Sequence, residues 1–218
     1  MKLTRDKKPK KMTWRKIPTQ GVILISGHRG EGKSALGWWL VQEMHKRTKK
    51  PVITFGLAII ARKLFPQRGF GKGGITHTVA IDKINRAKSS IIIVDEASFI
   101  DDSMSSTNKE WLKLIAICRH KDHLLIFIHQ QSRQIDIQIM MDADLVMMKR
   151  PTQLHIREAR PSFAPEIQEA YDLFNRMEGD SKKKVYVVDY HYGARALLPA
   201  YMPTWWNSKM SKAYSSVI

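Results

Sequence analysis

The chain contains Gly27-His28-Arg29-Gly30-Glu31-Gly32-Lys33-Ser34 directly after the apolar run Val22-Ile23-Leu24-Ile25. This octet fits the pattern G-x-x-x-x-G-K-[ST] at every fixed position, and a helical pattern follows it. A strand, a glycine-rich turn and a helix in this order form a cradle for nucleotide phosphates. We therefore expect a nucleotide site made by Gly27, His28, Arg29, Gly30, Glu31, Gly32, Lys33, Ser34 and Ala35.

A second apolar run, Ile91-Ile92-Ile93-Val94, ends in the acidic pair Asp95-Glu96. Lys33 is expected to reach the β- and γ-phosphates, and Ser34 and Asp95 are expected to hold Mg²⁺. Glu96 then stands where a general base would polarise the attacking water, which favours hydrolysis over transfer to another acceptor. Two adjacent acids at a strand end can also form only a helix N-cap.

The composition points to a globular chain with a polyanionic partner. The chain has 218 residues, of which 43% are hydrophobic, and a formal net charge of +17. Such an excess favours nucleic acid or an anionic membrane as partner. The single Cys118 excludes a disulfide framework. His120, His123 and His129 lie close in sequence, but without a carboxylate or thiolate at ligand spacing, so ordinary histidines are favoured over a metal site.

The first 17 residues hold eight Lys or Arg against the single acid Asp6. We expect a mobile basic arm over residues 1–17, which either contacts nucleic-acid phosphates or is a solvated tail. No stretch approaches the ~20 apolar residues of a membrane span. The N-terminus also lacks the apolar core of a secretory signal, so an intracellular protein without a membrane span is expected.

Short apolar runs alternate with helical patterns over residues 18–150. Strands are expected at residues 21–26, 52–55, 91–94, 124–128 and 145–148, and helices at 33–46 and around 111–118. Continuously apolar strands between helices indicate a parallel sheet covered on both faces. The phosphate loop, the acidic pair and His129-Gln130 all follow strands, so they should meet at one edge of the sheet.

From Pro151 the pattern changes to a helix opened by Pro165 and a hairpin over residues 185–198. We interpret residues 151–218 as a C-terminal extension of the same domain. Its aromatic tail, with Trp205, Trp206 and Tyr214, is expected to pack on its own domain rather than on a neighbouring subunit or a partner protein.

Basic residues outside the loop suggest further contacts. Phosphoryl transfer in oligomeric ATPases often uses an arginine from a neighbouring subunit, and the candidates are Arg119, Arg133 and Arg150. Residues 62–74 form a glycine-rich basic loop that either contacts a polyanion such as nucleic acid or is a plain surface loop. Its possible DNA contacts are Arg62, Lys63, Arg68 and Lys72.

Cys118-Arg119-His120-Lys121, then the strand 124–128 with His129-Gln130, then Ile135-Asp136, form an ordered set of motifs. With the two nucleotide motifs, this set resembles the HerA/FtsK superfamily of DNA-pumping ATPases over residues 21–150. Within it, the chain looks closest to small viral genome-packaging ATPases. It is also similar to zonula-occludens-toxin-like phage assembly ATPases.

The resemblance implies a RecA-like P-loop NTPase fold, with a mainly parallel central sheet flanked by helices and a small helix-and-hairpin extension. It implies ATP and Mg²⁺ as cofactors, Gln130 as a polar sensor and Arg119 as the arginine that acts across a subunit interface. His129 stands where the family usually has threonine. The expected assembly is a ring, a hexamer or pentamer, with double-stranded DNA in its centre and a capsid or portal-vertex protein as a further partner.

The expected function is an ATP-hydrolysing DNA translocase that packages a viral genome, in the host cytoplasm and associated with the virion. One alternative is a phage assembly or secretion ATPase. Others are a nucleotide-gated DNA-binding protein with low turnover and a small-molecule kinase. The net charge of +17 argues against the kinase, because a small acceptor does not require such an excess. Stimulation of ATP hydrolysis by DNA separates these classes.

Overall fold

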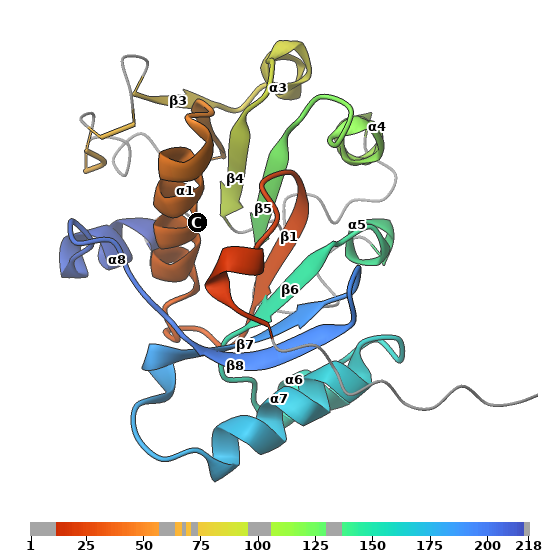
Figure 1. Cartoon of the computed structure of the whole chain (residues 1–218), viewed down its shortest axis with the longest axis vertical. Coiled ribbons are helices and arrows are strands. Elements are labelled where there is room, and N and C mark those ends of the chain that lie inside the picture. Colours follow the sequence, from red (N-terminus) through yellow and green to blue (C-terminus); the bar gives the residue numbers. More distant parts are fainter. Residues whose placement is uncertain are drawn as a thin grey trace, which may run out of the picture.

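The structure is a computed structural model that describes residues 12–56, 64–66, 69–70, 74–95, 106–129 and 137–215. One mixed sheet of eight strands runs through the molecule in the order β3-β2-β4-β5-β1-β6-β7-β8 (Figure 1). The strands are β1 (Gly21–Ser26), β2 (Val52–Phe55), β3 (Ile75–Thr78), β4 (Ile91–Asp95), β5 (Leu124–Ile128), β6 (Leu145–Met148), β7 (Lys184–Asp189) and β8 (Ala194–Pro199). Strands β1 to β6 are parallel, whereas β7 and β8 are antiparallel to their neighbours.

Helices cover both faces of the sheet (Figure 1). The helices are η1 (Trp14–Lys16), α1 (Lys33–Thr48), α3 (Ile81–Arg86), α4 (Ser106–Ile117), α5 (Ile137–Met141), α6 (Gln153–Arg157), α7 (Ala164–Arg176), η4 (Ser181–Lys183) and α8 (Ser208–Ser215). One apolar cluster joins α1 and α8 to one face, and a second joins α3, α4, α5 and α7 to the other. In β1, Ile23 and Ile25 belong to the first cluster, while Val22 and Leu24 belong to the second. The strand is apolar throughout because both of its faces are buried.

The five expected parallel strands and the helix after the phosphate loop are confirmed. The α1 helix continues to Thr48 and ends where Lys49 takes a left-handed conformation before Pro51. Strand β3 was not expected, because Ile75-Thr76-His77-Thr78 carries polar residues and sits at the edge of the sheet with Thr76 exposed. Its pairing with β2, rather than an apolar run, defines it as a strand.

The expected C-terminal helix and hairpin are α7, β7 and β8. The Asp189 carboxylate accepts the backbone N–H groups of His191 and Tyr192 at 2.9 and 3.0 Å, which closes the turn of the hairpin. The expectation for the aromatic tail is confirmed for Trp205 and Trp206, which pack against the α1 side of the core. The Trp205 indole also donates to Gln42 at 3.1 Å. The Tyr214 side chain lies outside the described ones.

The expectation of a mobile arm that reaches residue 17 is wrong for residues 12–17. Met12 and Ile17 are 0% and 3% exposed and belong to the core. The Trp14 ring meets Trp39 edge to face at 4.6 Å, and its indole N–H donates to the Pro199 carbonyl at 3.0 Å. These apolar side chains override the basic composition because they bury surface on α1. Residues 1–11 lie outside the described ones.

Among the helices that the structure describes, none is both long enough and apolar enough to cross a bilayer.

Candidate functional site

The phosphate-binding loop connects β1 to α1 at the carboxyl edge of the sheet, meaning the edge where the parallel strands end. Its glycines Gly27, Gly30 and Gly32 have φ values of 137°, 82° and 83°. A Cβ atom on Gly30 or Gly32 would meet nothing within 4 Å. On Gly27 it would lie 2.8 Å from both Cβ and the carbonyl oxygen of Lys149. Two glycines therefore serve the conformation of the loop, whereas Gly27 also serves close packing.

Lys33 opens α1 and folds back over the loop. Its side chain is 8% exposed, and its ammonium donates to the His28 carbonyl at 3.1 Å. Ser34 lies half-buried in the same first turn, with Ala35 buried behind it. The N–H groups at the start of a 16-residue helix add partial positive charge at this point. The loop and the helix start thus form one anion-binding surface.

Asp95 ends β4, two strands away from the loop. Strand β5 lies between β1 and β4, so that Ile128 is paired with both Ile25 and Asp95. Two strand spacings separate the backbones by roughly 10 Å. His129 is buried after β5, and its N–H donates to the Ile25 carbonyl at 3.0 Å. The topology therefore brings the ends of β1, β4 and β5 together at one edge, as the sequence predicted.

Several expected site residues lie outside the described part of the chain, and their roles stay predictions. They are Glu96, Gln130, Arg133, Arg62, Lys63, Arg68 and Lys72. Glu96 directly follows Asp95, and Gln130 directly follows His129.

The two described arginine candidates lie at opposite edges of the sheet. Arg119 precedes β5 and pairs with Asp144, whose other carboxylate oxygen accepts the Val22 N–H at 2.8 Å. This is the amino edge, where the parallel strands begin, so Arg119 points away from its own phosphate loop. Arg150 follows β6, and its carbonyl accepts the His28 N–H at 3.3 Å. Its guanidinium donates to Asn175 at 3.4 Å, so Arg150 belongs to the surroundings of its own loop.

A cavity of about 460 Å³, which the sequence did not predict, adjoins the loop on the β6 side. His28 and Glu31 of the loop, Arg150 after β6, and Tyr171 and Asn175 of α7 contribute to its wall. A capping box between Thr152 and His155 fixes the start of α6 beside it. No local pattern marks this cavity, because its residues lie far apart in sequence.

The fold and the loop define the class: a nucleotide-binding P-loop ATPase with a RecA-like, mainly parallel sheet. The chain belongs to the family described as the Sigma-54 interaction domain, whose model matches residues 4–156. The fold and the family match both confirm that the chain is a P-loop ATPase, as the motifs predicted. No curated protein matches the sequence.

Solved structures with the same fold include two forms of a viral ATPase. The genome packaging NTPase B204 of Sulfolobus turreted icosahedral virus 2, in complex with ATP-gammaS, is 12% identical with a TM-score of 0.64. That match covers 85% of this chain and 100% of the other. The DNA-packaging ATPase B204 of Sulfolobus turreted icosahedral virus is 15% identical with a TM-score of 0.65, over 84% of this chain and 98% of the other. The pCW3 conjugation coupling protein TcpA is 13% identical with a TM-score of 0.57, over 89% and 64%.

Proposed function

We propose that this ATPase moves double-stranded DNA and packages a viral genome. The observation that carries the proposal is the formal net charge of +17 on a chain whose described part is almost wholly an ATPase fold. A binding site for a small acceptor does not need such an excess, whereas a polyanion that passes over the surface does. The B204 structures, named for packaging, support it, since they share the fold over 98% and 100% of their own length.

In this proposal the carboxyl edge hydrolyses ATP. Lys33 binds the β- and γ-phosphates together with the N–H groups of the loop. The Ser34 hydroxyl and the Asp95 carboxylate form an oxygen donor set of the kind that Mg²⁺ prefers, and the ion neutralises phosphate charge when bound. Glu96 takes the proton of the attacking water, and Gln130 contacts the γ-phosphate or that water.

The positions of the strands also orient the nucleotide. The γ-phosphate then faces β5 and β4, because Asp95 ends β4 and Glu96 is the next residue. The nucleoside end then extends to the other side of β1, toward the cavity beside Arg150 and Tyr171. The rings of His28 and Tyr171 offer stacking surfaces for a base, and Asn175 offers hydrogen bonds.

The proposal includes a ring of five or six subunits around the DNA. Arg119 is 57% exposed at the amino edge, so its guanidinium could exchange Asp144 for a nucleotide bound by an adjacent subunit. The basic loop with Arg62, Lys63, Arg68 and Lys72 contacts the DNA phosphates, and a capsid or portal-vertex protein receives the motor. Such a motor works in the host cytoplasm and on the virion.

A second candidate is an ATPase that acts on a protein partner, and the matched family favours it because its name describes an interaction domain. A phage assembly or secretion ATPase of the zonula-occludens-toxin-like type is a separate candidate, closely related to the packaging ATPase. A DNA-binding protein with low turnover is a further candidate within the same fold. For an ATPase that acts on a protein partner and for a DNA-binding protein with low turnover, DNA would leave the rate of ATP hydrolysis unchanged.

The deciding experiment measures ATP hydrolysis with and without double-stranded DNA, for the wild type and for Glu96→Gln. We expect DNA to stimulate the wild type. The variant should lose about 10²- to 10⁴-fold in kcat and still bind ATP, because only proton removal from water is lost. An equal rate of ATP hydrolysis with and without DNA would contradict the translocase proposal. Full activity of the variant would remove Glu96 as the base.

A further inference from the structure

Besides Lys33 of the phosphate loop, two further lysines are buried, at opposite edges of the sheet. Lys50 is 7% exposed at the amino edge, and Lys149 is 1% exposed at the carboxyl edge beside the phosphate loop. A buried ammonium group is costly unless hydrogen bonds replace its water. In both lysines the ammonium group donates to backbone carbonyls, which replace the lost water.

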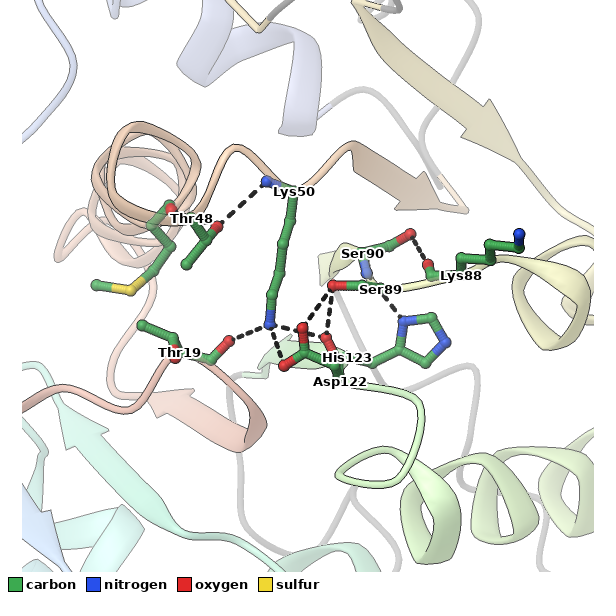
Figure 2. Close-up of polar contacts among 9 residues, drawn as sticks. Thr19, Thr48, Lys50, Lys88, Ser89, Ser90, Asp122 and His123 are labelled. Atoms are coloured by element: carbon green, nitrogen blue, oxygen red, sulfur yellow. Dashed lines mark hydrogen bonds and ion pairs between the residues drawn. The ribbon is translucent and has the colours of Figure 1, made fainter.

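Lys50 joins the beginnings of neighbouring strands (Figure 2). Its ammonium donates to the carbonyls of Thr19 and Asp122 and to the Asp122 carboxylate, each at 2.7 Å. Ser89 donates to the same carboxylate at 2.7 Å. These residues precede β1, β2, β4 and β5, at the edge away from the nucleotide. Lys50 therefore stabilises the sheet without contact with the site.

Lys149 instead links the phosphate loop to the start of β7. Its N–H donates to the Ser26 carbonyl at 2.8 Å, and its Cβ packs against Gly27, the first residue of the loop. Its ammonium donates to the carbonyls of Lys182 and Lys184 at 2.6 and 2.7 Å. One side chain thus spans from the first glycine of the loop to the η4 helix and the first residue of β7.

A second contact joins the same two segments. The Ser181 hydroxyl of η4 donates to the Glu31 carboxylate of the loop at 3.3 Å. Burial lowers the pKa of Lys149 to about 8, while the charges of Glu31 and Asp180 favour its protonated form and Lys182 opposes it. Lys149 is therefore mostly charged at neutral pH. Its protonation responds to any new negative charge in the loop.

We propose that Lys149 is a positioning residue for ATP: together with Glu31 and η4, it clamps the phosphate-binding loop to the start of β7 in its phosphate-binding conformation. The clamp lies on the β6 side of the loop, away from Asp95 and the γ-phosphate chemistry. It therefore acts on nucleotide affinity more than on the hydrolytic step. The proposal rests on ATP binding at this loop and not on DNA movement.

The test compares Lys149→Met with Lys50→Met, since both changes replace a buried ammonium with an apolar side chain of similar length. Calorimetric titration with ATP-γS, without DNA, gives Kd, and thermal unfolding gives stability. Both variants should have a lower Tm. Only Lys149→Met should weaken Kd, by about tenfold or more, because only this lysine touches the loop. Equal Kd values for the two variants would overturn the proposal.

The uptake of protons on nucleotide binding is a second measurement. Loss of a lysine that only stabilises the fold would not change this uptake. Near pH 8, bound triphosphate raises the pKa of Lys149, so the wild type should take up a fraction of a proton of up to about one half. Titrations in two buffers of different ionisation enthalpy measure this uptake. Lys50→Met should retain it and Lys149→Met should lose it. Uptake that persists in Lys149→Met contradicts the proposal.

If Lys149→Met does not fold, Ser181→Ala tests the same clamp more gently, with Ser89→Ala as its control. Each change removes one hydroxyl that donates to a carboxylate, Glu31 in the first case and Asp122 in the second. We expect Ser181→Ala to weaken Kd for ATP-γS about threefold and Ser89→Ala to leave it unchanged. No difference between the two would overturn the clamp, whatever DNA does to hydrolysis.

Discussion

Among single residues, the glycines of the phosphate-binding loop are required for different physical reasons. Gly30 has a left-handed conformation in open space, so a side chain there would cost only backbone strain. Gly27 has a φ of 137°, a region that residues with a Cβ rarely enter, and it lies against Lys149. Gly30 is therefore required only for its backbone conformation, whereas Gly27 is required for its conformation and for close packing.

We predict that Gly27→Ala is much more damaging than Gly30→Ala. Gly30→Ala should lower the free energy of unfolding by about 1 kcal/mol. Gly27→Ala should cost about 3 kcal/mol or more, because strain and a contact with the Lys149 backbone add together. It should also weaken ATP binding more, because the backbone shift begins at the loop. Chemical unfolding and ATP-γS titration of both variants measure these differences.

The outcome that contradicts this prediction is a similar loss of stability in both variants. That result would mean that the Lys149 side of the loop adjusts freely, and the clamp on β7 would lose its geometric basis.

At the scale of elements, the beginnings of β4 and β5 depend on a neutral histidine (Figure 2). His123 is fully buried before β5, and its Nδ1 accepts the Ser90 N–H at 3.1 Å. Burial lowers the pKa of His123, and the charges of Lys121 and Lys50 lower it further, whereas Asp122 opposes them. The folded chain therefore resists protonation of a ring that the unfolded chain protonates readily.

We predict a loss of stability as the pH falls below the ordinary histidine value of 6.5. Between this value and the lower pKa of the folded state, the unfolded chain binds more protons, so stability rises with pH and is fully present above the window. The contribution of His123 should fall by up to about 1 kcal/mol from about pH 7.5 to about pH 5.5.

The matched variant is His123→Asn, whose side-chain oxygen can accept the same N–H without titrating. Urea unfolding of both proteins at the two pH values gives the difference. If the wild type and His123→Asn lose stability in parallel, another group carries the pH dependence.

At the scale of the whole molecule, charge is distributed unevenly. Residues 1–11 hold six Lys or Arg against Asp6, and they precede a segment that Trp14 anchors to α1 and β8. The anchor stabilises the fold, whereas residues 1–11 lie outside the described part of the chain and contribute charge.

For the proposed DNA translocase, we predict that deletion of residues 1–11 weakens DNA binding and leaves the fold intact. Each cation that contacts a phosphate contributes roughly 0.9 to the slope of log K against log salt. The deletion should therefore reduce that slope by about 2 or more, while the Tm changes little. Fluorescence anisotropy with duplex DNA at several salt concentrations measures the slope. An unchanged slope would assign the arm to the solvated-tail alternative.

The corresponding control is Trp14→Ala in the full chain. This change removes the edge-to-face contact with Trp39 and the bond to Pro199, so it should lower the Tm. It should leave the salt slope unchanged at temperatures where the protein is folded. The deletion and Trp14→Ala together distinguish the effect of lost charge on DNA binding from the effect of lost stability.

The phosphate loop, the acidic strand end and the apolar strands could all be predicted from the sequence. These features are local: eight contiguous residues define the loop, and continuous apolar runs such as Leu124–Ile128 define strands buried on both faces. The edge strand β3 and the anchored segment at Met12 and Ile17 have no such local pattern. Their structure depends on pairing and burial against partners far along the chain.

Which residues surround the loop, and which lie at the opposite edge, depends on how the strands are arranged in the sheet. The strand order puts β5 between the loop and Asp95 and puts Arg119 at the opposite edge. It brings Lys149 after β6, and Tyr171 and Ser181 from the C-terminal part, to the loop. A lysine at position 149 is only one more basic residue in a basic chain until β7 lies beside β6. Strand order depends on long-range packing, which no local pattern encodes.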